Sequence, residues 1–421
     1  MNKGFIVILA TLLVLSAGLV IVLSAGYISL CNVKIVRNNI YSVQAYYAAE
    51  AGIEDSLLRL NKEMNFSKTN NFTVGEGTAT IEIADPIGGS RTITSSGDVS
   101  NRIRKVRTIR AMTTEKVSFY YGAQVGEGGM TMGNDSEIQG NVFSSGSIIG
   151  AGHITGTVKV AGDNNKIQDL SIDGDAYAHK CYDCTINGNL YSWTGGSADN
   201  CGQEGIQGNP VLSKSLPITE ETIAVWQNEA SCNNDPDCIF SGNYTVLQNT
   251  TVYLGPKKIE GDLILENNAV LVVTGTIWVV GDGATTEGEI LPGNNAEIKL
   301  DSSFGSTSGV VLANGKIEVA NDVKLTGSGM EGSYLMLLST KDSTDPDYPA
   351  INVLNNAEGA ILYAADGPLH LHNDIVIGEG TAKSIILDNG AIIQYRSGLK
   401  DTSFSSGPGG SWEILEWKEV E

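Results

Sequence analysis

The stretch that decides the fold is KGFIVILATLLVLSAGLVIVLSAGYISLCNVKIVRNNIYSVQAYYAAEAGIEDSLLRLN, residues 3–61. Its first part, residues 5–30, carries no charged side chain and is rich in Val, Ile, Leu and Ala. About 20 apolar residues cross a bilayer as a helix, so this run is long enough to cross with room to tilt. The sequence therefore predicts that residues 5–30 span a membrane.

The apolar run continues, without a helix breaker, into an amphipathic stretch. Its apolar residues recur at the helical spacing of three and four. These residues are Val36, Ile40, Val43, Tyr47, Ile53, Leu57 and Leu60. We therefore predict one helix from Phe5 to about Asn61, lipid-soluble in its first half and amphipathic in its second.

Three interpretations of this N-terminus are open. A cleavable secretory signal has an apolar core of roughly 7–15 residues, and the run here is longer. A permanent membrane anchor fits the length, with Lys3 holding the N-terminus in the cytoplasm, although Lys34 and Arg37 on the far side weaken that orientation. The third interpretation comes from the residues around the start of the run.

Lys3-Gly4-Phe5 places a basic residue and a glycine directly before the apolar run. This arrangement resembles the processing site of type IV prepilins. The resemblance implies that residues 1–4 form a leader, that a prepilin peptidase cleaves after Gly4, and that Phe5 becomes the methylated N-terminus.

Within the amphipathic stretch, QAYYAAEAGIE at residues 44–54 resembles a segment of PilX-type minor pilins, and the likeness extends over residues 3–60. The central residues of this motif are Ala48, Ala49, Glu50, Ala51 and Gly52. Major pilins carry Glu at the fifth mature position, where this chain has Leu9. The resemblance therefore implies a minor or tip subunit whose partners are other pilin or pseudopilin subunits.

The next segment predicts a small antiparallel sheet over residues 72–114. The strings FTVGEGTATIEIAD, RTITSSGDV and NRIRKVRTIRAMTT are rich in β-branched residues and are separated by Gly-containing turn signals. Helix and sheet together form a pilin-like α+β region at residues 31–116. We expect the cations of the last string to meet Glu50, Glu54 and Asp55 of the helix rather than a ligand. These cations are Arg102, Arg104, Lys105, Arg107 and Arg110.

Charge divides the chain in two. Residues 1–116 carry 13 Lys and Arg against 9 Asp and Glu, whereas the remainder carries 14 against 39, a net charge of −25. An acidic body repels phosphate, which argues against nucleic acid as a partner. It suits a domain that lies in water beyond a membrane.

From residue 117 to residue 421, short apolar strands alternate with Gly, Asn and Asp. A polar pair followed by an apolar strand recurs, as in GNNAEIKL, first at intervals of 27 residues and then of 34, 18 and 15. The leading residues are Asn267, Asn294, Asn321, Asn355, Asn373 and Asp388. Irregular spacing around a coil-sized unit indicates stacked rungs with variable loops. We therefore predict an all-β parallel β-helix, or β-solenoid, with hydrogen-bonded Asn ladders at its turns.

Two other segments of this region have distinct patterns. Residues 217–229 predict a helix capped by Thr219. The C-terminal string SWEILEWKEVE, with two Trp among four Glu, predicts a charged cap for one end of the solenoid.

Cysteine usage is typical of an oxidising exterior. Apart from Cys31 at the end of the membrane segment, the cysteines gather in an insertion at about residues 181–240. They are Cys181, Cys184, Cys201, Cys232 and Cys238. The CxxC pair and Cys201, with one further Cys, have the number of ligands for zinc. Two disulfides, Cys232–Cys238 and one among the first three, are favoured, which leaves one odd cysteine.

No metal or cofactor is predicted. His370 and His372 alternate on one face of a strand, but the sequence offers no third ligand nearby, so ordinary strand positions are expected. The oxygen-rich loops at residues 233–237 and 342–347 lack the glycine and distant Glu of an EF-hand.

The sequence also lacks GxSxG, Walker, HExxH and strand–helix GxGxxG motifs, and no carboxylate pair stands out. We therefore expect a non-enzymatic minor pilin or pseudopilin subunit of pilus biogenesis. It would cross the membrane of a bacterial cell envelope once, with the N-terminus cytoplasmic and the solenoid outside for adhesion or as a spacer. Expected partners are the lipid bilayer, prepilin peptidase and other subunits, and candidate targets are surface glycans or ligands on host or neighbouring cells.

Two alternatives stay open. One is a bitopic surface adhesin with an uncleaved anchor. The other is a tethered glycan-active β-helix enzyme, because polysaccharide lyases and glycosidases also use parallel β-solenoids.

Overall fold

The structure is a computed structural model of the chain. It describes residues 3–61, 69–83, 90–112, 114–202, 205–396, 398–405 and 412–420. The chain forms two compact units. The first, which we call the head, contains the N-terminal helix and a five-stranded sheet, and the second contains a large parallel sheet.

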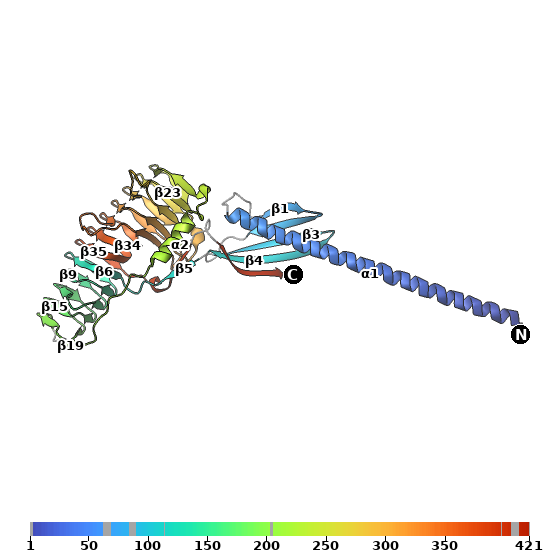
Figure 1. Ribbon diagram of the computed structural model, residues 1–421, viewed down its shortest axis with the longest axis horizontal. Helices are drawn as coiled ribbons and strands as arrows, with labels where there is room; N and C mark the ends of the chain where they lie inside the picture. The colour runs from blue at the N-terminus through green and yellow to red at the C-terminus, as the bar shows by residue number, and fades with distance from the viewer. Residues whose placement is uncertain are drawn as a thin grey trace. The chain divides into compact units, whose positions relative to one another are not determined.

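Helix α1 (Lys3–Asn61) is a single continuous helix, which confirms the prediction for this segment (Figure 1). From Phe5 to Val43 nearly all its large apolar side chains are exposed. From Ala45 onward one face is buried against the sheet of the head. Its apolar first half thus lacks a partner among the described residues.

The sheet of the head has the strand order β1-β2-β3-β4-β38. Its strands are β1 (Thr69–Val74), β2 (Gly77–Ile83), β3 (Ser90–Val99), β4 (Arg102–Met112) and β38 (Trp412–Val420). The pairs β1–β2 and β2–β3 are antiparallel, as predicted for the meander. Ile53 of α1 packs with Ile81, Ile93 and Val106 of the sheet in a small apolar core.

Strand β38 corrects two predictions. The C-terminal string was expected to cap the solenoid within a domain of residues 117–421, but residues 412–420 form the last strand of the head, next to β4. Trp417 packs against the core of the head. The alternating pattern of this string indicates a strand but does not say which sheet it joins, because pairing over some 300 residues leaves no local signal. The solenoid is therefore an insertion between two neighbouring strands of the head.

The second unit is a parallel β-solenoid, which confirms the predicted fold class. Two stretches of chain build its sheet of 31 strands. The first contributes β6 (Ala123–Met132), β7 (Glu137–Gln139), β8 (Val142–Ser144), β9 (Ile148–Gly150), β10 (His153–Ile154), β11 (Val158–Val160), β12 (Lys166–Gln168), β13 (Ser171–Ile172), β14 (Ala176–Tyr177), β15 (Lys180–Tyr182), β16 (Thr185–Ile186), β17 (Leu190–Ser192), β18 (Ser197–Asp199) and β19 (Ile206–Gln207).

The second stretch contributes β20 (Ile239–Ser241), β21 (Tyr244–Val246), β22 (Thr251–Leu254), β23 (Lys257–Glu260), β24 (Leu263–Leu265), β25 (Val270–Val273), β26 (Ile277–Val279), β27 (Ile290–Pro292), β28 (Glu297–Leu300), β29 (Gly309–Ala313), β30 (Ile317–Val319), β31 (Lys324–Thr326), β32 (Leu335–Ser339), β33 (Ile351–Val353), β34 (Glu358–Leu371), β35 (Val376–Leu387) and β36 (Ile392–Gln394). A separate two-stranded sheet joins β5 (Thr114–Val117) to β37 (Thr402–Ser405) in antiparallel fashion.

The coils do not stack in chain order. The late strands β35 and β36 pair in parallel with the early strands β6 and β7. The chain therefore enters the solenoid in the middle, winds to one end at β19, crosses to the other end at β20 and winds back to the middle. Figure 1 shows β19 and β23 toward opposite ends of this unit, with β6 and β35 between them.

The crossing segment contains helix α2 (Glu220–Ala230), which is close to the predicted helix. The Thr219 hydroxyl accepts a hydrogen bond from the amide of Thr222 and caps the helix, as predicted. Trp226 of α2 is buried in an apolar cluster with Phe404 and Tyr363, outside the interior of the coils. This cluster fastens the crossing segment to the solenoid.

The Asn pairs form the predicted ladder. Asn267 Oδ1 accepts the amide hydrogen of Asn294 at 3.0 Å, and Asn294 Oδ1 accepts that of Asn321 at 3.2 Å. In five of the six predicted pairs the second residue takes the left-handed backbone, as at Asn268 and Asn295, with φ of 60° and 58°. In the sixth, predicted at Asp388, the pattern is shifted by one residue: Asn389 makes the bond to the next coil, and Gly390 makes the turn with φ of 71°. The two residues of such a pair thus have different roles: the side chain of the first accepts a hydrogen bond from the next coil, and the backbone of the second makes the turn.

Candidate functional site

The first candidate site is the exposed apolar half of α1. Over Gly4–Arg59 this helix is long and apolar enough to cross a membrane, with a hydropathy of 3.0 in its most apolar window. Gly4 and Phe5 lie in its first turns, and the Phe5 side chain is 68% exposed. Met1 and Asn2 of the predicted leader lie outside the described residues. The predicted cleavage site thus adjoins an apolar surface that the described residues leave uncovered.

The motif at residues 48–52 forms the contact between α1 and the sheet. Ala48, Ala49 and Gly52 are buried, whereas Glu50 and Ala51 are half-buried. A Cβ added at Gly52 would lie 2.1 Å from the Ser95 hydroxyl oxygen. The small side chains are therefore what lets the helix lie this close to the sheet.

The sheet contributes a glycine to the same contact. A Cβ at Gly97 of β3 would lie 1.9 Å from the carbonyl oxygen of Ala45, one turn before the motif. Helix and strand backbones therefore touch directly. The motif fixes α1 to the head, and its described contacts are structural.

Two arginines of the basic string, Arg102 and Arg104 of β4, bind other partners than those predicted. Arg104 donates to the Ser42 hydroxyl at 2.7 Å and forms an ion pair with Glu419 of β38 at 2.9 Å. Arg102 donates to the Asn38 side chain at 2.5 Å. The register of β4 places these residues beside an earlier part of α1 than Glu50, Glu54 and Asp55. The Arg110 side chain lies outside the described residues.

The cysteines form two disulfides, Cys181–Cys201 and Cys232–Cys238. Cys184 is a buried free thiol that lies beside the first disulfide and donates to the carbonyl oxygen of Tyr182 at 3.2 Å. Burial raises the pKa of this thiol, so it stays protonated and unreactive at neutral pH. In this arrangement two of the three thiols of the possible zinc site are consumed by a disulfide.

His370 and His372 have a neighbour that the sequence did not reveal. Asp388 Oδ2 lies 3.0 Å from His370 Nε2 and 3.1 Å from His372 Nδ1. The expectation of no third ligand is therefore wrong. Leu371 and Leu387 pair between adjacent strands. The residues that follow these strand ends, His372 and Asp388, therefore lie beside one another, although they are 16 residues apart in the chain. Burial, followed by the charge of His370, lowers the pKa of His372.

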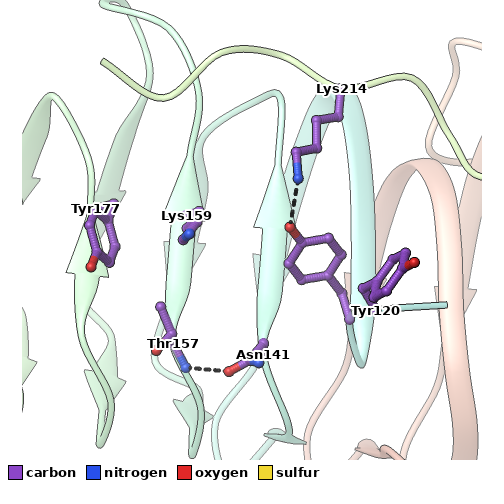
Figure 2. Close-up of a pocket in the computed structure, with 7 residues that line it drawn as sticks. Tyr120, Asn141, Thr157, Lys159, Tyr177 and Lys214 are labelled. Carbon is purple, nitrogen blue, oxygen red and sulfur yellow. Dashed lines mark hydrogen bonds between the residues drawn. The ribbon is translucent and has the colours of Figure 1, made fainter. Parts of the chain in front are cut away.

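A further pocket opens on the first stretch of the solenoid (Figure 2), with a volume of about 540 Å³. Its lining residues are Tyr120, Tyr121, Asn141, Thr157, Lys159, Tyr177 and Lys214. Lys214 Nζ donates to the Tyr121 hydroxyl at 3.1 Å, and Lys159 Nζ lies 5.0 Å from the centroid of the Tyr177 ring. The pocket combines aromatic faces with two cations on an otherwise acidic body.

A ladder of tyrosines borders this pocket. Tyr177 stacks on Tyr191 of the next coil, with ring centroids 4.5 Å apart and an interplanar angle of 12°. No residue of this pocket was predicted from the sequence. The sequence does contain a signal for it, since Tyr177 and Tyr191 are 14 residues apart, which is the length of the local coil. Only the pairing of strands β14 and β17 shows that the two rings stack.

One buried carboxyl stands apart from these sites. Glu379 of β35 is fully buried, accepts a hydrogen bond from Thr381 at 2.6 Å, and has no partner for its second oxygen among the described residues. Burial raises its pKa well above the ordinary range, so the carboxyl is held protonated.

These observations define the head as a membrane-compatible helix fixed to a small sheet by Ala and Gly residues. Residues 3–54 match the PilX N-terminal family. The N-terminal segment of the chain is therefore pilin-like. No curated protein matches the chain.

Among solved structures, the chain is similar to the competence-associated pilin ComZ from Thermus thermophilus. The match has 12% sequence identity and a TM-score of 0.23, and covers 90% of this chain and 97% of that one.

Proposed function

We propose that this chain is a minor pilin or pseudopilin-type subunit of a type IV pilus-related filament in a bacterial cell envelope. The observation that carries the proposal is the apolar half of α1, which is exposed from Phe5 to Val43. Before assembly, the bilayer covers residues 5–30 as a single span. After assembly, the corresponding helices of neighbouring subunits replace the lipid.

The role that we propose is mechanical rather than catalytic. Leu9 occupies the position of the Glu that major pilins carry, which favours a minor or tip subunit over a repeating one. The chain leaves the head after β4 and returns to it at β38, so two segments of the chain connect the solenoid to the head. A double attachment resists pulling better than a single flexible tail, as a spacer or adhesive module requires.

The test is maturation by a prepilin peptidase. The full chain is expressed in a bacterial membrane with and without the peptidase, and intact mass and N-terminal sequencing are measured. We expect a mature chain that starts at Phe5 and carries an N-methyl group. Gly4→Leu should abolish cleavage, whereas the control Gly18→Leu, in the same helix, should leave it unchanged.

Other start sites would contradict this proposal. A chain that keeps Met1 or Asn2 in the presence of active peptidase is a permanently anchored surface protein. A chain that starts near Gly26 is a secreted one. Either result would refute the proposal that the chain matures as a pilin.

A second function, adhesion, is favoured by the tyrosine-lined pocket. Aromatic faces pack against the C–H faces of sugar rings, and polar groups such as Asn141 are available to bond their hydroxyls. Lys159 and Lys214 add positive charge, so we propose an anionic glycan as the ligand.

Binding of the full chain in detergent to immobilised polygalacturonate, with dextran as the neutral comparison, tests adhesion. Tyr177→Ala should weaken binding by about tenfold, because it removes one stacked ring. The matched control is Tyr253→Ala, because Tyr253 is 65% exposed on β22 outside the pocket. Equal binding to both polymers, or equal losses in both variants, would refute a specific anionic-glycan site.

A further inference from the structure

We propose that His370, His372 and Asp388 form a binding site for a divalent transition-metal ion with a preference for imidazole ligands, of which Zn²⁺ is the probe. The two histidines lie on and directly after β34, and Asp388 directly follows β35. Their ligand atoms all lie within 4.8 Å of one another. The site therefore joins two adjacent coils of the solenoid.

The hydrogen-bond pattern of His372 favours a cation between this residue and Asp388. Its Nε2 lies 3.0 Å from Asn352 Oδ1, and its Nδ1 lies 3.1 Å from Asp388 Oδ2. Both ring nitrogens thus face an oxygen acceptor, but a neutral imidazole carries only one N–H. If Nε2 donates to Asn352, the lone pair of Nδ1 points at a carboxylate, and a cation between these two atoms turns a repulsive contact into two bonds.

The two histidines converge on a single oxygen atom. Asp388 Oδ2 also lies 3.0 Å from His370 Nε2, so both imidazoles meet the same carboxylate oxygen. Ligand atoms about 2.0–2.1 Å from zinc lie slightly more than 3 Å apart in a tetrahedral site, so small side-chain movements suffice. The rings already stack, with centroids 4.0 Å apart.

The surroundings also suit an ion. The side chains of His370, His372 and Asp388 are 20%, 29% and 35% exposed, so an ion has access from solvent and water can complete its coordination. Asn352, on the neighbouring strand β33, holds the His372 ring by its other nitrogen, as an outer hydrogen bond does in metal sites. Two imidazoles and one carboxylate favour Zn²⁺, Ni²⁺ or Cu²⁺ over the oxygen-seeking Ca²⁺.

A bound ion would fasten coils close to the seam of the solenoid. Strand β35, which leads to Asp388, pairs with β6, where the late coils meet the early ones. An ion held by residues of two coils stabilises the folded state in proportion to its occupancy. The melting temperature of the chain should therefore rise with zinc concentration.

The experiment is zinc titration by calorimetry of the full chain in detergent after removal of metal with a chelator. We expect one tight site per chain and a melting temperature that rises with zinc. Asp388→Asn, which preserves the shape of the side chain, should weaken binding by at least tenfold, and His372→Ala should abolish it. Asn352→Ala should cost about tenfold in affinity.

Two controls separate this site from other zinc ligands. His153→Ala is the matched control, because His153 also faces carboxylates on the solenoid, Asp173 at 3.0 Å and Glu137 at 3.9 Å, and it should keep wild-type affinity. Cys184→Ser is the second control: it tests whether the buried thiol binds zinc, and it should also keep wild-type affinity. Co²⁺ in the wild-type site should give visible bands without the near-ultraviolet sulfur-to-cobalt charge-transfer band of a thiolate ligand.

The result that overturns the proposal is a wild-type chain that takes up no zinc, or an Asp388→Asn variant that binds as tightly as wild type. A melting curve of each metal-free variant shows whether it has folded. If His372→Ala does not fold, the isosteric Asp388→Asn variant decides alone.

Discussion

The first half of α1 and the interior of the solenoid are built from the same side chains, Val, Ile and Leu, and differ in what covers them. In α1, Val14 and Leu15 are each 72% exposed, whereas Ile298 in the solenoid is fully buried. Each coil of the solenoid covers its neighbours, so that interior is complete within one chain. The described residues leave the first half of the helix uncovered, and under the proposed function lipid or other subunits cover it. Apolar composition alone therefore does not say whether a region stabilises the monomer or the assembly.

The largest expected effect is on the free energy of unfolding, when the same substitution, Ile to Ala, is made in each of these two regions. Ile298→Ala removes a side chain that lies between Leu271 and Leu325 of the adjoining coils, and it should lower the free energy of unfolding by about 2–5 kcal/mol. Ile21→Ala removes the same atoms from the exposed helix and should leave the solenoid unchanged. Urea unfolding of both variants in detergent measures the difference. Equal losses would mean that the exposed half of α1 contributes to the stability of the monomer.

The second effect concerns the region where α1 changes from exposed to buried. Gly97→Ala places a methyl group against the Ala45 carbonyl oxygen and should destabilise the head by about 1–3 kcal/mol, since no flexible side chain can give way. Gly18→Ala adds the same methyl to a helix position with nothing within 4 Å and is the control. Limited proteolysis of the head reports the loss. A Gly97→Ala head as resistant as the control would show that helix and sheet do not touch in this way.

The same contrast explains what the sequence could predict. The helix and the Asn ladder depend on local patterns, namely an unbroken apolar run and a polar pair before each strand. The place of β38, the meeting of β35 with β6 and the approach of Asp388 to His372 depend on which distant strands pair. Register between coils of unequal length cannot be read from one sequence, because 16, 18 and 34 residues all make one coil.

The sites follow the same division. Gly4, Phe5 and the motif at residues 48–52 are contiguous in the sequence, so their types and spacing were visible. The tyrosine pocket draws its lining residues from several coils, and the His370 cluster joins two histidines of one coil to Asp388 of the next. Among the cysteines, the short Cys232–Cys238 loop could be favoured from spacing, whereas the odd cysteine, Cys184, is decided by the stacking of coils that brings Cys181 to Cys201.

The smallest expected effect tests how apolar the packed regions of the solenoid are. Glu379 is protonated in the folded state because burial raises its pKa, whereas in the unfolded chain it ionises near its ordinary pKa. Above that ordinary value the unfolded state binds fewer protons than the folded one, so this carboxyl makes the protein less stable as pH rises. Below it the contribution is constant. Glu379→Gln keeps the shape and the contact with Thr381 but cannot ionise, so its advantage over wild type should grow from pH 5 to pH 8. Thermal melts of both proteins at these two pH values measure that trend. A difference that does not change with pH would mean that water reaches the carboxyl. This part of the solenoid would then be open to solvent, as the first half of α1 is, and not a closed apolar region.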